Sequence, residues 1–213
     1  MIKRELYLDF DCTLVDSALR TEHEKIFARM HRISADEYMA AARNLHKRFG
    51  AASFTYTRLF NILAEKRPWL SRKFLADLNG LLRRDYLFPD TLDFVSRFRP
   101  EELIIITEGD EWFQSEKIKN NGLENRVGEI RIVRGLKGDA IVPKKSVLQL
   151  FLDDAPRHID DVKRKHPSVF CIQMREPAPW EEQRESRLKD YHCRFLSEAA
   201  ETIKSIEARF KTL

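Results

Sequence analysis

Short apolar runs alternate along this chain with longer segments in which apolar residues recur every three or four positions. The short runs predict buried strands, and the longer segments predict amphipathic helices. The expected strands cover residues 5–9, 103–106, 129–133, 147–152 and 169–174, with a short last strand within 191–196. Strands that alternate with helices predict an α/β fold in which a doubly wound, mostly parallel sheet carries helices on both faces.

One segment departs from this alternation. Between residues 18 and 86 the apolar positions keep a helical spacing, and no strand pattern of useful length interrupts them. Such a stretch is too long for one crossover between neighbouring strands, since those connections are usually short. We therefore expect an α-helical cap inserted at residues 17–87, and an α/β core formed by residues 1–16 and 88–213.

Composition and charge narrow the class of protein. Lys and Arg number 38 and Asp and Glu 34, so the 213-residue chain has a formal charge of only +4. Charges of both signs are interspersed, without a basic stripe interleaved with aromatic residues, which argues against nucleic-acid binding. Three widely spaced cysteines predict a reducing compartment, and no run approaches the ~20 apolar residues of a membrane span. We expect a cytoplasmic monomer or homodimer without membrane contact.

Polar residues follow three of the expected strands. The first apolar run ends in Asp9 and Asp11, the second in Thr107, and the fourth in Asp153 and Asp154. In open parallel sheets the loops after the carboxyl ends of the strands converge, so these side chains are expected to lie at one edge. Carboxylates this close repel one another unless a cation or a shared proton intervenes. The pattern predicts a metal site or a catalytic site.

A lysine-bearing loop precedes the strand that ends in Asp153. It contains Lys137, Lys144 and Lys145, of which Lys137 is the slightly preferred candidate to reach the site. Four carboxylates, a hydroxyl and an ammonium suit phosphoryl transfer with Mg²⁺, which prefers hard oxygen ligands. A carboxylate can then attack phosphorus while a second acid protonates the leaving oxygen.

The segments DFDCTLVDS, LIIIT and FLDDAPRHIDDV resemble three motifs of the haloacid dehalogenase-like hydrolase superfamily, in the same order. The resemblance extends over essentially the whole chain, including a cap inserted after the first motif of a Rossmann-like core. It implies a Mg²⁺-dependent phosphatase that hydrolyses a small phosphorylated metabolite, a phosphomonoester, through an aspartyl-phosphate intermediate.

The resemblance also implies roles for individual residues. Asp9 would be the nucleophile and Asp11 the general acid and base. The metal would be held by Asp9, by the backbone carbonyl of Asp11 and by Asp154, with Asp153 close by. Thr107 and a lysine, either Lys137 or Lys144, would bind the phosphoryl oxygens.

The acid at position 11 separates branches of the family, because its dehalogenases and phosphonate hydrolases lack an acid there. The remaining alternatives are a sugar phosphomutase and a non-catalytic relative that binds a phosphorylated ligand. Two positions depart from the family pattern: Cys12 replaces the usual glycine, and His158 stands where a second acid often follows Asp154. We expect Cys12 and His158 to be structural, and Asp160 and Asp161 to lie on a helix surface.

Overall fold

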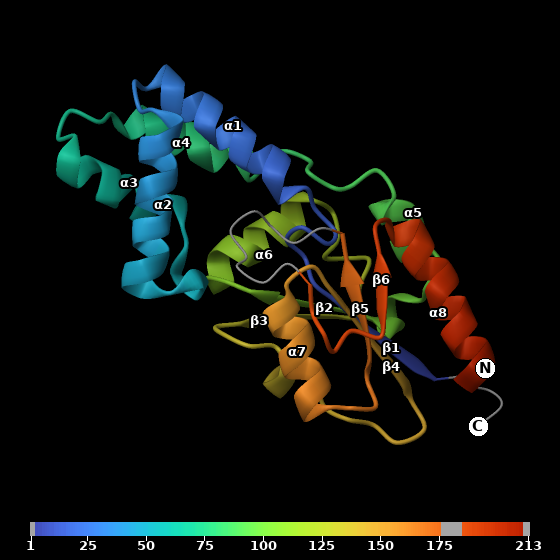
Figure 1. Ribbon diagram of the computed structural model, residues 1–213. Helices are drawn as coiled ribbons and strands as arrows, with labels where there is room; N and C mark the ends of the chain where they lie inside the picture. The colour runs from blue at the N-terminus through green and yellow to red at the C-terminus, as the bar shows by residue number, and fades with distance from the viewer. Residues whose placement is uncertain (1–2, 176–184, 211–213) are drawn as a thin grey trace.

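The sheet is built as the apolar runs predict. The computed structural model describes residues 3–175 and 185–210, and these contain one six-stranded sheet in the order β3-β2-β1-β4-β5-β6 (Figure 1). Every ladder in this sheet is parallel. The strands are β1 (Arg4–Leu8), β2 (Leu103–Glu108), β3 (Glu129–Val133), β4 (Leu148–Asp153), β5 (Phe170–Met174) and β6 (Tyr191–Cys193).

Helices cover both faces of this sheet, which explains why its central strands are apolar throughout. Successive side chains of a strand point to opposite faces. Accordingly, Leu6 and Leu8 join one hydrophobic cluster with residues of α5 and α8, whereas Tyr7 joins another with residues of α7. The helices of this core are α5 (Thr91–Ser96), α6 (Glu111–Asn120), α7 (Pro156–Lys165) and α8 (Leu196–Phe210), with short 3-10 turns at η2 (Pro100–Glu102) and η3 (Gly138–Ala140).

The segment expected to be a cap contains four helices that form a group of their own beside α6 (Figure 1). They are α1 (Ser17–Met30), α2 (Ala35–Phe49), α3 (Tyr56–Lys66) and α4 (Arg72–Leu81), with a 3-10 turn at η1 (Ala51–Ser53). Ser34, Thr55 and Ser71 cap α2, α3 and α4 through their side-chain oxygens. The helices bury a hydrophobic cluster of their own, in which Leu45, Leu59 and Leu78 are fully buried.

Two adjacent chain segments connect the four helices to the sheet. Val15, before α1, forms an antiparallel bridge with Leu87, which follows α4. The backbone N–H of Asp16 donates to the carbonyl of Tyr86 at 2.7 Å. The entry and exit of the helical segment are therefore held side by side, immediately beyond the end of β1. None of the described helices is both long and apolar enough to cross a membrane.

Candidate active site

Three carboxylates meet where β1 and β4 end. Asp9, Asp153 and Asp154 each offer an oxygen within 4.8 Å of the others. The parallel pairing of β1 with β4 produces this arrangement, because it places Leu8 opposite Leu152. All three carboxylates are buried, and no described residue donates a hydrogen bond to Asp9 Oδ2. The cluster therefore presents a buried oxygen without a protein donor, which suits a bound cation.

Lys137 is the cation in this cluster. Its Nζ lies 2.5 Å from Asp9 Oδ1 and 2.6 Å from Asp153 Oδ2, and the side chain is 1% exposed. Burial alone would lower the pKa of Lys137, but Asp153 and Asp9 raise it above its ordinary value. Burial and the neighbouring Asp153 raise the pKa of Asp9 despite Lys137. One ammonium among three carboxylates leaves room for a divalent cation.

Lys144 does not reach this site, so its assignment to phosphate binding is wrong. Its Nζ lies 2.5 Å from Glu5 Oε1, near the start of β1 and thus at the opposite edge of the sheet. The chain crosses from one edge to the other between Lys137 and β4. A lysine just before β4 must consequently lie at the amino end of that strand, far from its carboxyl end.

Thr107 lies at the same edge as the carboxylates, near the end of β2, and its side chain is buried. Its hydroxyl accepts a hydrogen bond of 2.8 Å from Gln114 Nε2. The hydroxyl proton remains able to donate to an oxygen bound in the cavity. The structure thus brings Thr107, Asp9 and Lys137 to one cavity.

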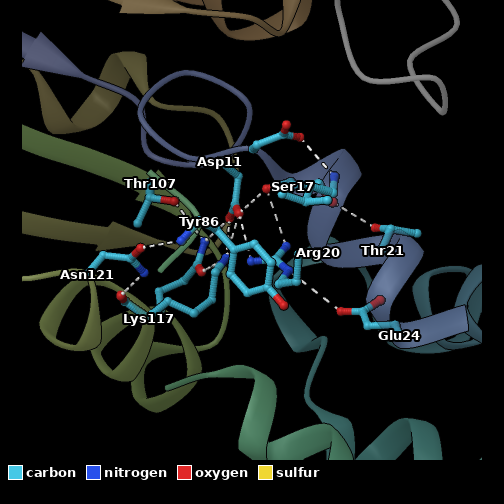
Figure 2. Close-up of polar contacts among 12 residues, drawn as sticks. Asp11, Ser17, Arg20, Thr21, Glu24, Tyr86, Thr107, Lys117 and Asn121 are labelled. Atoms are coloured by element: carbon cyan, nitrogen blue, oxygen red, sulfur yellow. Dashed lines mark hydrogen bonds and ion pairs between the residues drawn. The ribbon is translucent and has the colours of Figure 1, made fainter. Parts of the chain in front are cut away.

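Asp11 is held by two helices (Figure 2). From α6, Lys117 Nζ lies 2.5 and 2.6 Å from the two carboxylate oxygens, and Gln114 Nε2 donates at 3.0 Å. From α1, Ser17 Oγ donates at 2.6 Å and an Arg20 nitrogen lies 3.2 Å away. Although burial opposes it, Lys117 and Arg20 hold the pKa of Asp11 well below its usual range. Asp11 is therefore an ionised carboxylate in this arrangement.

The contacts of Asp11 add four residues to which the sequence analysis assigned no role. Ser17 and Arg20 belong to the first turn of α1, and Gln114 and Lys117 lie three residues apart on α6. Gln114 and Lys117 are buried together with Phe113 and Ile118. Polar residues at the buried positions of a helix that follows a motif strand are the signal that could have identified them.

A cavity of about 680 Å³ connects these groups with the helical segment. Met39, Ala42, Arg43 and His46 of α2 line it at helical spacing, so one stripe of α2 faces the strand ends. Phe54 and Phe113 add apolar wall. Burial lowers the pKa of His46. The cavity thus has a charged floor at the sheet and a wall in which apolar residues alternate with Arg43 and His46.

Helix α7, which follows β4, contributes buried polar residues next to the site. His158 is buried, as expected for a structural residue, with Nε2 3.3 Å from Glu108 Oε2. Burial and the nearby Lys137 lower the pKa of His158 to about 4. The expectation that Asp160 and Asp161 lie on a helix surface is wrong, because both are buried. Asp161 accepts a hydrogen bond from a backbone N–H of the Lys137 turn, and Asp160 accepts one from Ser186.

Cys12 occupies a strained backbone position. Its φ of 62° lies in the left-handed region, where glycine is favoured because it lacks Cβ. The glycine that is usual at this position of the resembled motif would adopt this conformation without strain. Burial and the neighbouring carboxylates, Asp154 first, raise the pKa of the Cys12 thiol.

Comparisons with known proteins identify the fold. No protein-family model and no curated protein matches the sequence. Among solved structures, a haloacid dehalogenase-like hydrolase of Burkholderia xenovorans LB400 superposes with a TM-score of 0.72 at 17% identity, over 99% of both chains. The L-2-haloacid dehalogenase of Xanthobacter autotrophicus, with chloropropionic acid covalently bound, gives 0.67 at 15% identity, over 96% of this chain and 99% of the other.

A third structure is that of the HAD-hydrolase YfnB of Bacillus subtilis bound to magnesium. It superposes with a TM-score of 0.62 at 15% identity, over 95% of this chain and 99% of the other. These similarities confirm the α/β fold and its likeness to haloacid dehalogenase-like hydrolases. They do not separate phosphatase from dehalogenase, and the residues of the site must do so.

Proposed function

We propose that this chain, which has the fold of the haloacid dehalogenase-like hydrolases, is a Mg²⁺-dependent phosphatase of small phosphomonoesters. The observation that carries the proposal is the buried cluster of Asp9, Asp153 and Asp154, which contains one lysine and leaves Asp9 Oδ2 without a described donor. Three carboxylates with one ammonium retain a net negative charge that a divalent cation neutralises. The chemistry of this donor set fits Mg²⁺, the ion bound by YfnB.

Asp9, Asp154 and the backbone carbonyl of Asp11 would hold the ion, with Asp153 beside it. When bound, Mg²⁺ neutralises charge on the phosphoryl oxygens. Asp9 would attack phosphorus and form the aspartyl-phosphate, while Lys137 and Thr107 bind the non-bridging oxygens. Asp11, which is ionised in the free protein, would take up a proton from solvent when the phosphomonoester binds and give it to the leaving oxygen. It would then take a proton from the water that hydrolyses the aspartyl-phosphate.

Two features favour hydrolysis of a phosphate ester over displacement of a halide. The first is the acid at position 11, which the resemblance associates with phosphatases. A leaving alkoxide needs a proton and a leaving halide does not, so a carboxyl group beside the leaving atom serves only the former. The second is the carboxylate cluster itself, because a cation site is useful for a dianionic phosphate.

The test is phosphate release from 4-nitrophenyl phosphate with and without Mg²⁺. We expect hydrolysis by the wild type with Mg²⁺, its loss with a chelator, and its loss in Asp9→Asn. Asp16→Asn is the matched control, because Asp16 lies in the same loop but caps α1, a role that asparagine also fills. Activity that survives in Asp9→Asn, or chloride release from 2-chloropropionate without any phosphatase activity, would contradict the proposal.

A second assay would identify the preferred substrate. A panel of nucleotides, sugar phosphates and phosphoglycolate, screened at neutral pH with Mg²⁺, should reveal a preferred small phosphomonoester. Asp9→Asn should be inactive on that substrate as well. Transfer of the phosphoryl group to a second hydroxyl of a sugar phosphate, in place of release, would indicate a mutase.

A further inference from the structure

Lys117 is a buried cation that pairs with Asp11, the proposed general acid and base. The residue is 4% exposed, and its Nζ contacts both oxygens of Asp11 and, at 2.6 Å, Gln114 Oε1. The rings of Phe10 and Phe113 lie 5.2 and 5.6 Å from the same nitrogen. A buried ammonium is costly unless it is paired and hydrogen-bonded, so Lys117 depends on Asp11 for its place in the core.

Gln114 and Lys117 form a hydrogen-bonded pair. Gln114 Nε2 donates to Asp11 Oδ2 at 3.0 Å, while Gln114 Oε1 accepts from Lys117. The same Nε2 lies 2.8 Å from Thr107 Oγ1, so the pair also bridges to the end of β2. Because Gln114 and Lys117 lie three residues apart, they project from one side of α6. The core thereby fixes the Asp11 carboxylate in position and orientation.

Helix α1 contacts the other side of Asp11. Ser17 donates to Oδ1, and Arg20 lies 3.2 Å from the same oxygen. Arg20 is also 3.6 Å from Glu24, whose two oxygens accept from the hydroxyls of Tyr38 and Tyr56. Asp11 therefore lies between the core and the helical segment, as Figure 2 shows. Without Lys117, the remaining cation at Asp11 would come from the helical segment alone.

We propose that Lys117 is the positioning residue of Asp11, and that it holds this carboxylate on the core, where it can exchange a proton with the leaving oxygen. The inference rests on the proposed function, since it assigns to Asp11 the transfer of that proton. Lys117 acts through Asp11 and has no contact with phosphorus in this role. Its loss should consequently impair leaving-group departure and leave phosphate binding nearly intact.

Leaving groups of different basicity provide the test, because a 4-nitrophenolate departs readily without a proton and an alkoxide does not. The kinetics of wild type, Lys117→Met and Lys119→Met are compared on 4-nitrophenyl phosphate and 2-phenylethyl phosphate with Mg²⁺. Lys119 is the control, since it lies on the exposed side of the same helix. Lys117→Met should lower kcat for the alkyl ester by about 100-fold, the low end of a general-acid contribution. On the nitrophenyl ester the loss should stay within about threefold, with KM little changed on both.

Asp11→Asn should show the same dependence of kcat on the leaving group. The double variant Asp11→Asn/Lys117→Met should lose no more activity than either single variant, as expected for residues that act as a unit. An equal loss on both esters in Lys117→Met would overturn the positioning role. Absence of hydrolysis by the wild type would instead overturn the proposed function, so the two failures are distinguishable.

Unfolding measurements keep the inference testable if Lys117→Met folds poorly. Asp11→Asn leaves the buried ammonium of Lys117 without its carboxylate, and Lys117→Met leaves Asp11 with Arg20 as its remaining described cation. The double variant removes both charges. Denaturant midpoints should therefore be strongly non-additive, with the double variant more stable than the sum of the single changes predicts. Additive midpoints would overturn the pairing on which the positioning role depends.

Discussion

The backbone N–H of Gly138 donates a hydrogen bond of 2.7 Å to Asp161 Oδ2, which ties the turn that carries Lys137 to helix α7. His166 Nε2 lies 2.8 Å from the Gly138 carbonyl, which belongs to the next peptide unit of the same turn. The approach is so close that a Cβ on Gly138 would lie 2.6 Å from Asp161 Oδ2. The position of Lys137 in the site thus depends on a buried carboxylate of α7.

Replacement of Asp161 by alanine should displace Lys137. The change leaves the Gly138 N–H without its buried acceptor, at a cost of about 1–3 kcal/mol in the free energy of unfolding. Phosphatase activity should fall by about tenfold or more, since small displacements of positioned groups are costly in catalysis. Asp139→Ala is the control, because Asp139 lies in the same turn but is exposed and pairs with Lys165. Equal activity of the two variants would show that Asp161 does not position Lys137.

The carboxylate cluster could be predicted because it depends on strand ends alone. Apolar runs predicted the strands, and in a parallel sheet the carboxyl ends share an edge whatever the strand order. The adjacency of β1 and β4, which brings Asp9 beside Asp153, could not be derived from the runs. Lys144 was assigned to the site because it is close to Asp153 in sequence. The strand between the two residues crosses the sheet, so Lys144 lies at the opposite edge.

The partners of Asp11 could not be predicted, because they depend on how helices pack. Arg20 reaches Asp11 only through the placement of α1 over the strand ends, and Lys117 only through the rotation of α6 about its axis. Asp161 was expected to lie on the surface of its helix. Its burial results from the packing of η3 against α7, a contact between segments about 20 residues apart.

Mg²⁺ should stabilise the folded protein, because the carboxylate cluster exists only in the native state. The stabilisation should follow the free ion concentration and reach about 2.7 kcal/mol at 100 times the dissociation constant. Asp154→Asn should lose most of this effect, since it removes one charged ligand from the cluster. Urea unfolding with Mg²⁺ or a chelator measures it, with Asp139→Asn as the control. An unchanged Mg²⁺ effect in Asp154→Asn would place the ion elsewhere.

The contribution of His158 to the free energy of unfolding should decrease as the pH falls from about 6.5 to about 4. Burial and Lys137 lower its pKa from 6.5 to about 4, so within this range the unfolded chain binds a proton that the folded protein does not. Stability from this group is complete above 6.5 and is lost as the pH falls through the folded value. The difference corresponds to about 3 kcal/mol.

Urea unfolding of the metal-free protein from pH 4 to 7.5 measures this dependence. Despite its burial, Glu108 keeps a pKa of about 2 through His158 and Arg157, so it stays ionised across the range. Burial raises the pKa of Asp9, which gives an opposing dependence in the same range, so the measured quantity is the difference between wild type and His158→Gln. That difference should change across the range by most of the stated amount. His192→Gln, a change at an exposed histidine, should leave the wild-type pH dependence intact. Parallel curves for His158→Gln and wild type would contradict the assignment.

Arg43 should select substrates that carry a second anionic group. It lies on the stripe of α2 that faces the cavity, between the apolar Met39 and the weakly basic His46. No described side chain forms an ion pair with Arg43, whereas Arg48 on the same helix lies 3.4 Å from Glu65. A carboxylate on the leaving group could therefore pair with Arg43 without displacing a protein anion.

A pair of esters that differ in one charge tests this selection: 4-carboxyphenyl phosphate and its neutral isostere, 4-carbamoylphenyl phosphate. An ion pair at an exposed residue contributes up to about 1 kcal/mol, so Arg43→Met should raise KM for the carboxylate ester by up to about fivefold. KM for the amide ester should change by less than about twofold, because that ester lacks the charge. Arg48→Met should leave both values unchanged. If Arg43→Met raised both KM values equally, Arg43 would contribute to the shape of the cavity and not to the recognition of charge.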